Sequence, residues 1–352
     1  MNLSLLLTNN PARQHKPGRK AAFPGQPSGE RGFSIVEMMI SITIGLVIVV
    51  ALVGVLVSNS RTSKTNDRTS ELKENGRYAL DNIKRELRHA GYRGYTPKAP
   101  ESGGWVIPAI TNECNATGVT SDGSFIKNVR QAVWGAENGN PFPGNCIPSA
   151  NYNTASNSDV LVIRHADVTP TLAASAAVLG STLFLHSTYT GESLLQGSAV
   201  PATDITGAEN AIWHVYVYYI GYDTNDHSVP ALHRVTLSGT DMLDEMIVSG
   251  IEKLKLEYGI ANAAAGTTQY YTASDLGGST DYSATGVTAW DNVTSVRIWL
   301  LARNASAEAG YTNTSVYEMG SLNVANGNAY TVNDSFRRQL FSSVVQLRNF
   351  RD

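Results

Sequence analysis

The chain has few cysteines, few charged side chains and none of the short motifs that mark common enzymes. It contains two cysteines, Cys114 and Cys146, and 16% of its 352 residues are charged. Neither cysteine has a second Cys or a His beside it at metal-ligand spacing, so the cysteines do not predict a metal site. Serine-hydrolase, Walker A, zinc-protease and dinucleotide-binding sequences are all missing. We therefore expect no enzymatic activity and no cofactor.

The histidines and acids likewise show no ligand spacing. Four of the seven histidines lie in or beside predicted strands: His165, His186, His214 and His233. We interpret them as hydrogen-bonded structural residues. Asp223 and Asp226, in the sequence DTNDH, are candidate calcium ligands, but the regular acid spacing and the closing Glu of a calcium loop are missing. A solvated hairpin turn explains this run better, and we expect no metal site.

One long hydrophobic run is present, at residues 38–57. Its ~20 residues, mostly Val and Ile, can cross a ~30 Å hydrocarbon core as a helix. A single acid, Glu37, lies at its edge. A charge carried into a bilayer costs at least ~2.5 kcal/mol, so we expect this carboxylate to have a function. The alternative is an interfacial side chain that reaches water.

The flanks of the run indicate how it is oriented and whether it is kept. Residues 1–32 carry five basic residues against one acid, Glu30, and basic flanks stay on the cytoplasmic side. After the run comes SNSR at 58–61, which is no small-residue cleavage site. The run is therefore expected to remain in the mature protein as a single membrane span.

The sequence GFSIVE at 32–37 resembles the start of type IV prepilins. This resemblance implies that a prepilin peptidase removes residues 1–32 by cutting after Gly32, and that the new N-terminal Phe33 is N-methylated. It also implies that Glu37 is the assembly residue, able to pair with the ammonium of Phe33 in its own or a neighbouring subunit. The leader of 32 residues is long for the family.

Removal of this leader makes the protein more acidic. Five basic residues and one acid are lost, so the formal charge moves from −3 to −7. An acidic surface does not attract a polyanion, and nucleic acid is not an expected partner.

Residues 58–91 continue as an amphipathic helix. Apolar residues recur at spacings of three, four and seven along it: Leu72, Ala79, Ile83, Leu87 and Ala90. This stripe predicts that the second half of the helix packs on a globular head. Gly91 is the predicted stop, and Gly45, Gly54 and Gly76 are candidate bend points.

After Gly91 the pattern changes to that of strands. β-branched and aromatic residues, separated by turn-forming clusters, mark 159–168, 181–186, 211–223, 231–239, 253–261, 293–304 and 341–350. We predict an α+β, type IV pilin-like fold, with one long N-terminal helix packed on an antiparallel β-rich head. The expected divisions are a leader at 1–32, a transmembrane half-helix at 33–57, a periplasmic half-helix at 58–91 and a head at 92–352.

The two cysteines fit a head that faces the periplasm. Cys114 and Cys146 lie in a Pro/Gly/Asn-rich region, and an oxidising compartment favours a disulfide between them. Closing a loop of about 33 residues would stabilise the fold by roughly 3–4 kcal/mol. Two free thiols are the alternative.

Four segments resemble the PilW family of type IV pilus minor pilins, which is related to the J-type minor pseudopilins of type II secretion. They are LKENGRYALDNIKRELRHAGYRG, VSGIEKLKLEYGIA, VTSVRIWLLARN and SFRRQLFSSVVQLRN, whereas residues 97–245 carry no matching motif. The resemblance implies an inner-membrane protein that joins other minor pilins and the major pilin at the pilus tip, primes fibre assembly and can present an adhesin.

Two other functions remain open from the sequence. The first is a minor pseudopilin of a type II secretion system, with the same fold. The second is a membrane-anchored enzyme or surface binding domain that uses a pilin-like export signal. It would need a convergent polar site, which the sequence does not reveal.

Overall fold

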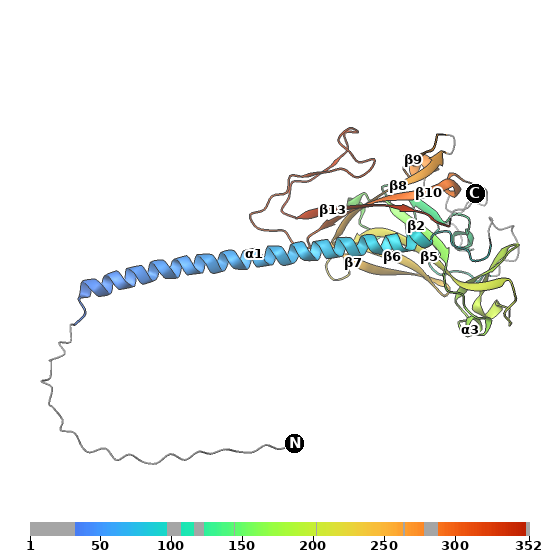
Figure 1. Cartoon of the computed structure of the whole chain (residues 1–352), viewed down its shortest axis with the longest axis horizontal. Coiled ribbons are helices and arrows are strands. Elements are labelled where there is room, and N and C mark those ends of the chain that lie inside the picture. The colour runs from blue at the N-terminus through green and yellow to red at the C-terminus, as the bar shows by residue number, and fades with distance from the viewer. Residues whose placement is uncertain are drawn as a thin grey trace, which may run out of the picture. The chain divides into compact units, whose positions relative to one another are not determined.

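The computed structural model describes residues 32–96, 107–115, 123–143, 145–201, 203–262, 265–277 and 288–349. The chain divides into two compact units, residues 1–61 and 62–352. Helix α1 (Ile35–His89) contributes to both, and the other elements follow in the second unit (Figure 1). The predicted leader, up to Arg31, lies outside the described residues.

The first unit contains the apolar part of α1. Its large hydrophobic side chains are all exposed, from Phe33 to Val57. By length and composition this stretch could cross a membrane, and none of its most apolar window is buried. The prediction of an apolar helix here is confirmed, beginning at Ile35.

In the second unit the rest of α1 packs on the head through the predicted stripe. Leu72, Ala79, Ile83 and Leu87 are buried. The helix ends at His89, and Gly91 follows with φ of 75°, a left-handed conformation that favours glycine. Both the buried face and the stop were predicted correctly.

The head contains two main antiparallel sheets. The larger has seven strands in the order β1-β2-β5-β3-β4, with β6 paired to β5 and β7 paired to β6. These strands are β1 (Val133–Ala136), β2 (Val160–Ala166), β3 (Leu183–Thr188), β4 (Glu192–Gln196), β5 (Ala208–Tyr222), β6 (Pro230–Ser238) and β7 (Asp241–Ser249). The long strand β5 is central, because its first residues pair with β3 and its later ones with both β2 and β6.

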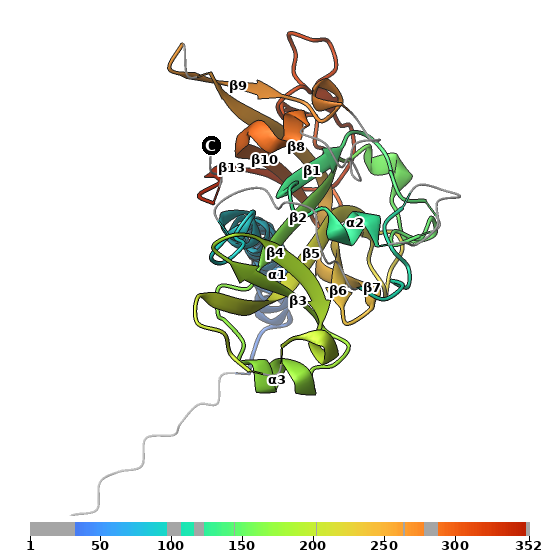
Figure 2. The same cartoon turned by 90° about the vertical axis from the view of Figure 1, so that its right-hand side faces the viewer.

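The smaller sheet has the order β13-β10-β8-β9. Its strands are β8 (Ile251–Asn262), β9 (Thr267–Tyr271), β10 (Val293–Arg303) and β13 (Arg338–Gln346). Gly250, at φ of 82°, is the one residue between β7 and β8 and so connects the two sheets. In Figure 2, β8, β9 and β10 lie at one end of the head, and β3, β4 and α3 lie at the other.

Short elements complete the head. They are the helices α2 (Ser124–Lys127) and α3 (Ala173–Val178), the two-stranded pair β11 (Val316–Tyr317) and β12 (Tyr330–Thr331), and the 3-10 turns η1 (Thr154–Ser156), η2 (Gly197–Ala199), η3 (Ser274–Leu276) and η5 (Ala289–Asn292). The core between the sheets and α1 is rich in aromatic residues, among them Trp134, Trp213, Trp290, Tyr218 and Tyr258.

Candidate assembly segment and helix-docking sites

The predicted processing and assembly residues lie at the start of α1. Gly32 and Phe33 precede the helix, and Phe33 is 82% exposed. The Ser34 hydroxyl accepts a hydrogen bond from the Val36 N–H at 3.3 Å, a side-chain contact that stabilises the first turn. Glu37 lies in that first turn, where a negative charge is favoured by the helix dipole. The Glu37 carboxylate is exposed and has no hydrogen-bond or ion-pair partner among the described residues.

The C-terminal strand holds α1 on the head. A Cβ on Gly76 would lie 2.1 Å from Cε2 of Phe341, so the ring of this β13 residue occupies the space beside the glycine. Asn75, one residue earlier, donates a hydrogen bond to the Ser249 carbonyl at 3.3 Å. Helix α1 continues as one helix through all three predicted bend points. At Gly76, the absence of a side chain makes room for the Phe341 ring.

The end of α1 is capped from the C-terminus of the chain. The Asn349 amide nitrogen lies 3.2–3.4 Å from the carbonyl oxygens of Arg88, His89 and Ala90. These are carbonyls that a helix end leaves without an internal partner. Sequence reasoning missed this contact because the cap comes from the opposite end of the sequence.

Charged residues join the C-terminal segment to the loop that precedes it. Arg337 pairs with Glu308, which accepts a hydrogen bond from the Thr65 hydroxyl of α1 at 3.1 Å. Arg338 is almost fully buried and pairs with Glu252 and Asp334. Burial alone would lower the pKa of Arg338, but hydrogen bonds to these two carboxylates raise it. The guanidinium therefore stays charged, and both arginines of the motif SFRRQLF are held by acids.

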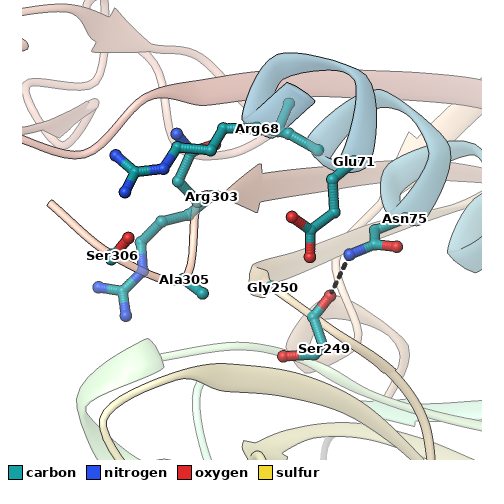
Figure 3. A pocket seen from close by; sticks show the side chains of 10 residues that line it. Arg68, Glu71, Asn75, Ser249, Gly250, Arg303, Ala305 and Ser306 are labelled. Carbon is teal, nitrogen blue, oxygen red and sulfur yellow. Dashed lines mark hydrogen bonds between the residues drawn. The ribbon is translucent and has the colours of Figure 1, made fainter. Parts of the chain in front are cut away.

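A small pocket lies between α1 and the head (Figure 3). Arg68, Glu71 and Asn75 line it from the helix, and residues 249–250 and 303–306 line it from the head. Its volume of about 80 Å³ is far below the roughly 300–1,000 Å³ of typical small-molecule sites. Asn304, at 5% exposure, finds no partner among the described residues for either polar atom of its side-chain amide. The pocket fits ordered water better than a substrate.

The predicted disulfide is present. Cys114 and Cys146 are bonded and both are buried, 32 residues apart in the sequence. The bond ties the segment before α2 to the loop that follows β1. The expectation that these two cysteines pair is confirmed.

The candidate calcium ligands belong to the turn between β5 and β6. Asp223 accepts a hydrogen bond from the Asn225 N–H at 2.8 Å, and Asp226 accepts one from the Ser228 N–H at 2.9 Å. Both carboxylates therefore order the backbone of the turn, as the sequence interpretation had it.

The four strand histidines all have hydrogen-bond partners. His186 contacts Asn210, His214 contacts Asp167 and His233 contacts Asp244. His165, on β2, contacts Glu86 of α1. This last contact brings a histidine of the sheet to an acid and a second histidine of α1, a grouping that the sequence did not reveal because 76 residues separate His89 from His165.

Comparison with known proteins relates these features to a family. The model of the type IV pilus-assembly protein W, PilW, matches residues 217–349, which hold β6 to β13 and most of the helix-docking contacts. The model of the prokaryotic N-terminal methylation motif matches residues 27–56. Together the two matches relate the chain to the PilW family of type IV pilus-assembly proteins. The PilW match begins within 97–245, the region where the sequence alone showed no family motif.

Other comparisons are more distant. A solved structure of a type IV-like pilin from Thermus thermophilus is similar over 82% of this chain and 98% of that chain, at 13% identity and a TM-score of 0.34. The comparison with curated proteins gave no match. Pilins are generally structural, non-catalytic proteins, and the PilW-family chain carries the methylation motif and the long apolar helix of a membrane-anchored prepilin.

Proposed function

We propose that this PilW-family protein is a minor pilin that joins other minor pilins in a complex at the pilus tip and helps to initiate fibre assembly. The observation that carries the proposal is the apolar part of α1 with Glu37 at its start. Its hydrophobic side chains are exposed and the Glu37 carboxylate has no partner among the described residues. Such a surface needs lipid before assembly and neighbouring helices afterwards.

The proposal includes the processing and location of the protein. Prepilin peptidase cuts after Gly32, Phe33 becomes the methylated N-terminus, and the half-helix at 33–57 spans the inner membrane. Residues 58–91 and the head at 92–352 then face the periplasm before they enter the pilus. The disulfide between Cys114 and Cys146 agrees with an oxidising compartment. The role is structural, with the major pilin, other minor pilins and an adhesin as partners.

A minor pseudopilin of type II secretion is the second candidate. The PilW match favours the pilus. Gene deletion distinguishes the two: loss of this protein should reduce the number of surface pili and leave secretion of type II substrates unchanged. In a complemented strain, immunogold label on the head should lie at fibre ends. Normal piliation together with lost secretion would overturn the pilus assignment.

Processing is tested by Gly32→Val. The prepilin peptidase needs a small, flexible residue before the scissile bond, so this variant should keep its leader and run as the larger precursor on an immunoblot. A matched change beyond the cleaved bond, Ser34→Ala, should be processed normally. Mature-sized protein from Gly32→Val would contradict cleavage at this position.

A further inference from the structure

A carboxylate and two imidazoles meet where the last turns of α1 lie against β2. Glu86 and His89 are three residues apart, hence on one face of the helix, and His165 projects from the strand. One potential ligand atom from each residue can be chosen so that all three lie within 4.8 Å of one another. It is the one such group of three found among the described residues.

His165 is oriented as a metal ligand would be. Its Nδ1 lies 2.8 Å from the Ala166 carbonyl oxygen, to which it can donate its proton. Its Nε2 then points at Oε2 of Glu86, 3.2 Å away. Metal-binding histidines usually donate their second ring N–H to a carbonyl or a carboxylate, which fixes the tautomer and the ring. The backbone of β2 provides that acceptor here.

His89 supplies a third, unused group. It is half-buried, and its ring nitrogens have no hydrogen-bond partner among the described residues. Its ring stands edge-on to that of His165, with centroids 5.5 Å apart. This half-buried imidazole, close to a carboxylate and a second imidazole, is therefore available as a metal ligand.

One carboxylate oxygen of Glu86 remains available to a metal ion. Arg85 Nε binds Oε1 of Glu86 at 2.9 Å, whereas Oε2 faces His165. Glu86 is 6% exposed and His165 is 3% exposed, so water competes little with these two side chains for a metal ion. The ring of His214 is tilted against that of His165, with centroids 5.2 Å apart, and it is held by Asp167.

We propose that Glu86, His89 and His165 bind one divalent transition-metal ion, with zinc as the best fit. Two imidazole nitrogens and one carboxylate oxygen form a usual zinc ligand set, and ligand atoms around a tetrahedral zinc are roughly 3.3 Å apart. The Glu86–His165 separation of 3.2 Å already matches. For all three residues to reach one ion, the side chain of His89 needs a small rotation. The ion replaces any proton on His165 Nε2, and that proton passes to solvent. A water molecule fills the fourth coordination position of the ion.

The metal would fasten the end of α1 to the head. Two ligands belong to the helix and one to the larger sheet, so the ion cross-links α1 to that sheet. Phe341 on β13 and Asn349 after it hold the same helix to the C-terminal segment. His233 provides a comparison: its nitrogens also face two acceptors, Asp244 and the Tyr222 carbonyl, but within the described part of the chain it belongs to no group of three potential ligands. The sequence predicted no metal site because Glu86 and His89 lie far from His165 along the chain.

The test uses the full chain in detergent, without a polyhistidine tag and after treatment with EDTA. Titration with Zn²⁺ alone should show one site per chain by calorimetry, and Co²⁺ should give the visible absorption of a tetrahedral N/O site. Bound Zn²⁺ should raise the melting temperature of the head. His89→Ala should weaken Zn²⁺ binding by at least about tenfold, in line with the effect of perturbing metal sites.

Two variants serve as controls. His227→Ala changes an exposed histidine in the turn between β5 and β6, and its Zn²⁺ affinity should equal that of the wild type. His89→Cys retains a zinc ligand and should bind more tightly than His89→Ala. Since His89 makes no hydrogen bond through its ring, neither change should unfold the head. Absence of a stoichiometric site in the wild type, or equal affinities in His89→Ala and His227→Ala, would overturn the proposal.

Discussion

The ring of Phe341 on β13 lies where a side chain on Gly76 of α1 would be. A Cβ at Gly76 would come within 2.6 Å of three carbons of that ring. The two residues belong to two of the four sequence segments that resemble the PilW family, one containing ENGRYAL in the helix and the other FRRQLFSSVVQLRN at the C-terminus. Their contact explains why the segments occur together, since the C-terminal strand is the surface on which the helix docks.

Gly76→Ala should destabilise the head. In an exposed helix this change would stabilise by up to ~1 kcal/mol, because alanine is the better helix former. Here the added methyl group overlaps a half-buried ring, and overpacking costs roughly 1–3 kcal/mol. We expect a lower melting temperature of the detergent-solubilised protein, measured by circular dichroism in the β region.

The control for this change is Gly54→Ala. Gly54 is also helical and exposed, and a Cβ there meets no atom within 4 Å, so Gly54→Ala should leave the stability unchanged or slightly raised. The double variant Gly76→Ala with Phe341→Leu should lose less stability than the sum of its single changes, because the smaller side chain makes room. Strict additivity would contradict the steric explanation.

Asn349→Ala should loosen the last turn of α1. The Asn349 amide is the donor to three carbonyls at the helix end, and its removal should cost about 1 kcal/mol, the usual net value of a side-chain hydrogen bond. Hydrogen exchange should be faster for the backbone amides near His89 and unchanged near Leu72. Arg348→Ala, at the exposed neighbouring position, should leave the exchange unaltered. Equal exchange in the two variants would show that the cap contributes nothing.

Most of the fold could be predicted from the sequence because its patterns are local. The apolar run, the 3.6-residue stripe and Gly91 fixed the course of α1, and each predicted strand corresponds to an observed one, from β2 to β13. Two of the missed strands, β1 and β7, have weak local signals. β1 has four residues, and β7 carries Asp241, Asp244 and Glu245, which are unusual in strands. β7 is stabilised by pairing with β6 instead.

The candidate sites were predictable only in part. GFSIVE predicts an assembly segment because its residues are contiguous, and the disulfide followed from two cysteines in a chain expected to face the periplasm. The grouping of Glu86, His89 and His165 depends on which strand lies against α1, and the role of Gly76 depends on the position of Phe341. Neither relationship has a local sequence pattern, so both required the tertiary structure.

His233 should make the stability of the head fall as pH rises. Burial would lower the pKa of His233, but hydrogen bonds to Asp244 and to the Tyr222 carbonyl outweigh it and raise the pKa above its usual value of about 6.5. A raised pKa means that the folded state favours the imidazolium. This contribution is fully present below about pH 6.5 and is lost as pH rises through the folded-state pKa.

The measurement is the melting temperature as a function of pH for the wild type and His233→Gln. His214 has the opposite shift, since burial lowers its pKa, so the informative quantity is the difference between the two profiles. That difference should be largest at low pH and shrink above the folded-state pKa of His233. His227→Ala, which changes an exposed histidine, should follow the wild type. A difference independent of pH would mean that His233 does not titrate in this way.

Glu37 should separate membrane insertion from fibre assembly. Glu37→Ala removes a carboxylate that is costly in lipid, whereas Gly32 and the basic flank are unchanged. Insertion and leader cleavage should therefore be normal or slightly improved. In the proposed bundle of pilin helices, the same change would leave the ammonium of Phe33 without its counter-charge, and an unpaired charge in a poorly solvated site costs a few kcal/mol.

If the proposed function holds, we expect fewer pili rather than altered pili, because a minor subunit would act in few copies at initiation. Glu37→Gln keeps the size of the side chain but loses its charge, so it should behave like Glu37→Ala if the ion pair matters. Ser41→Ala, one turn further along α1, is the matched control and should assemble normally. The measurements are surface pilus number and recovery of the other minor pilins with this subunit, each normalised to cleaved protein in the membrane. Wild-type values for both Glu37 variants would show that this carboxylate is an interfacial residue with no part in assembly.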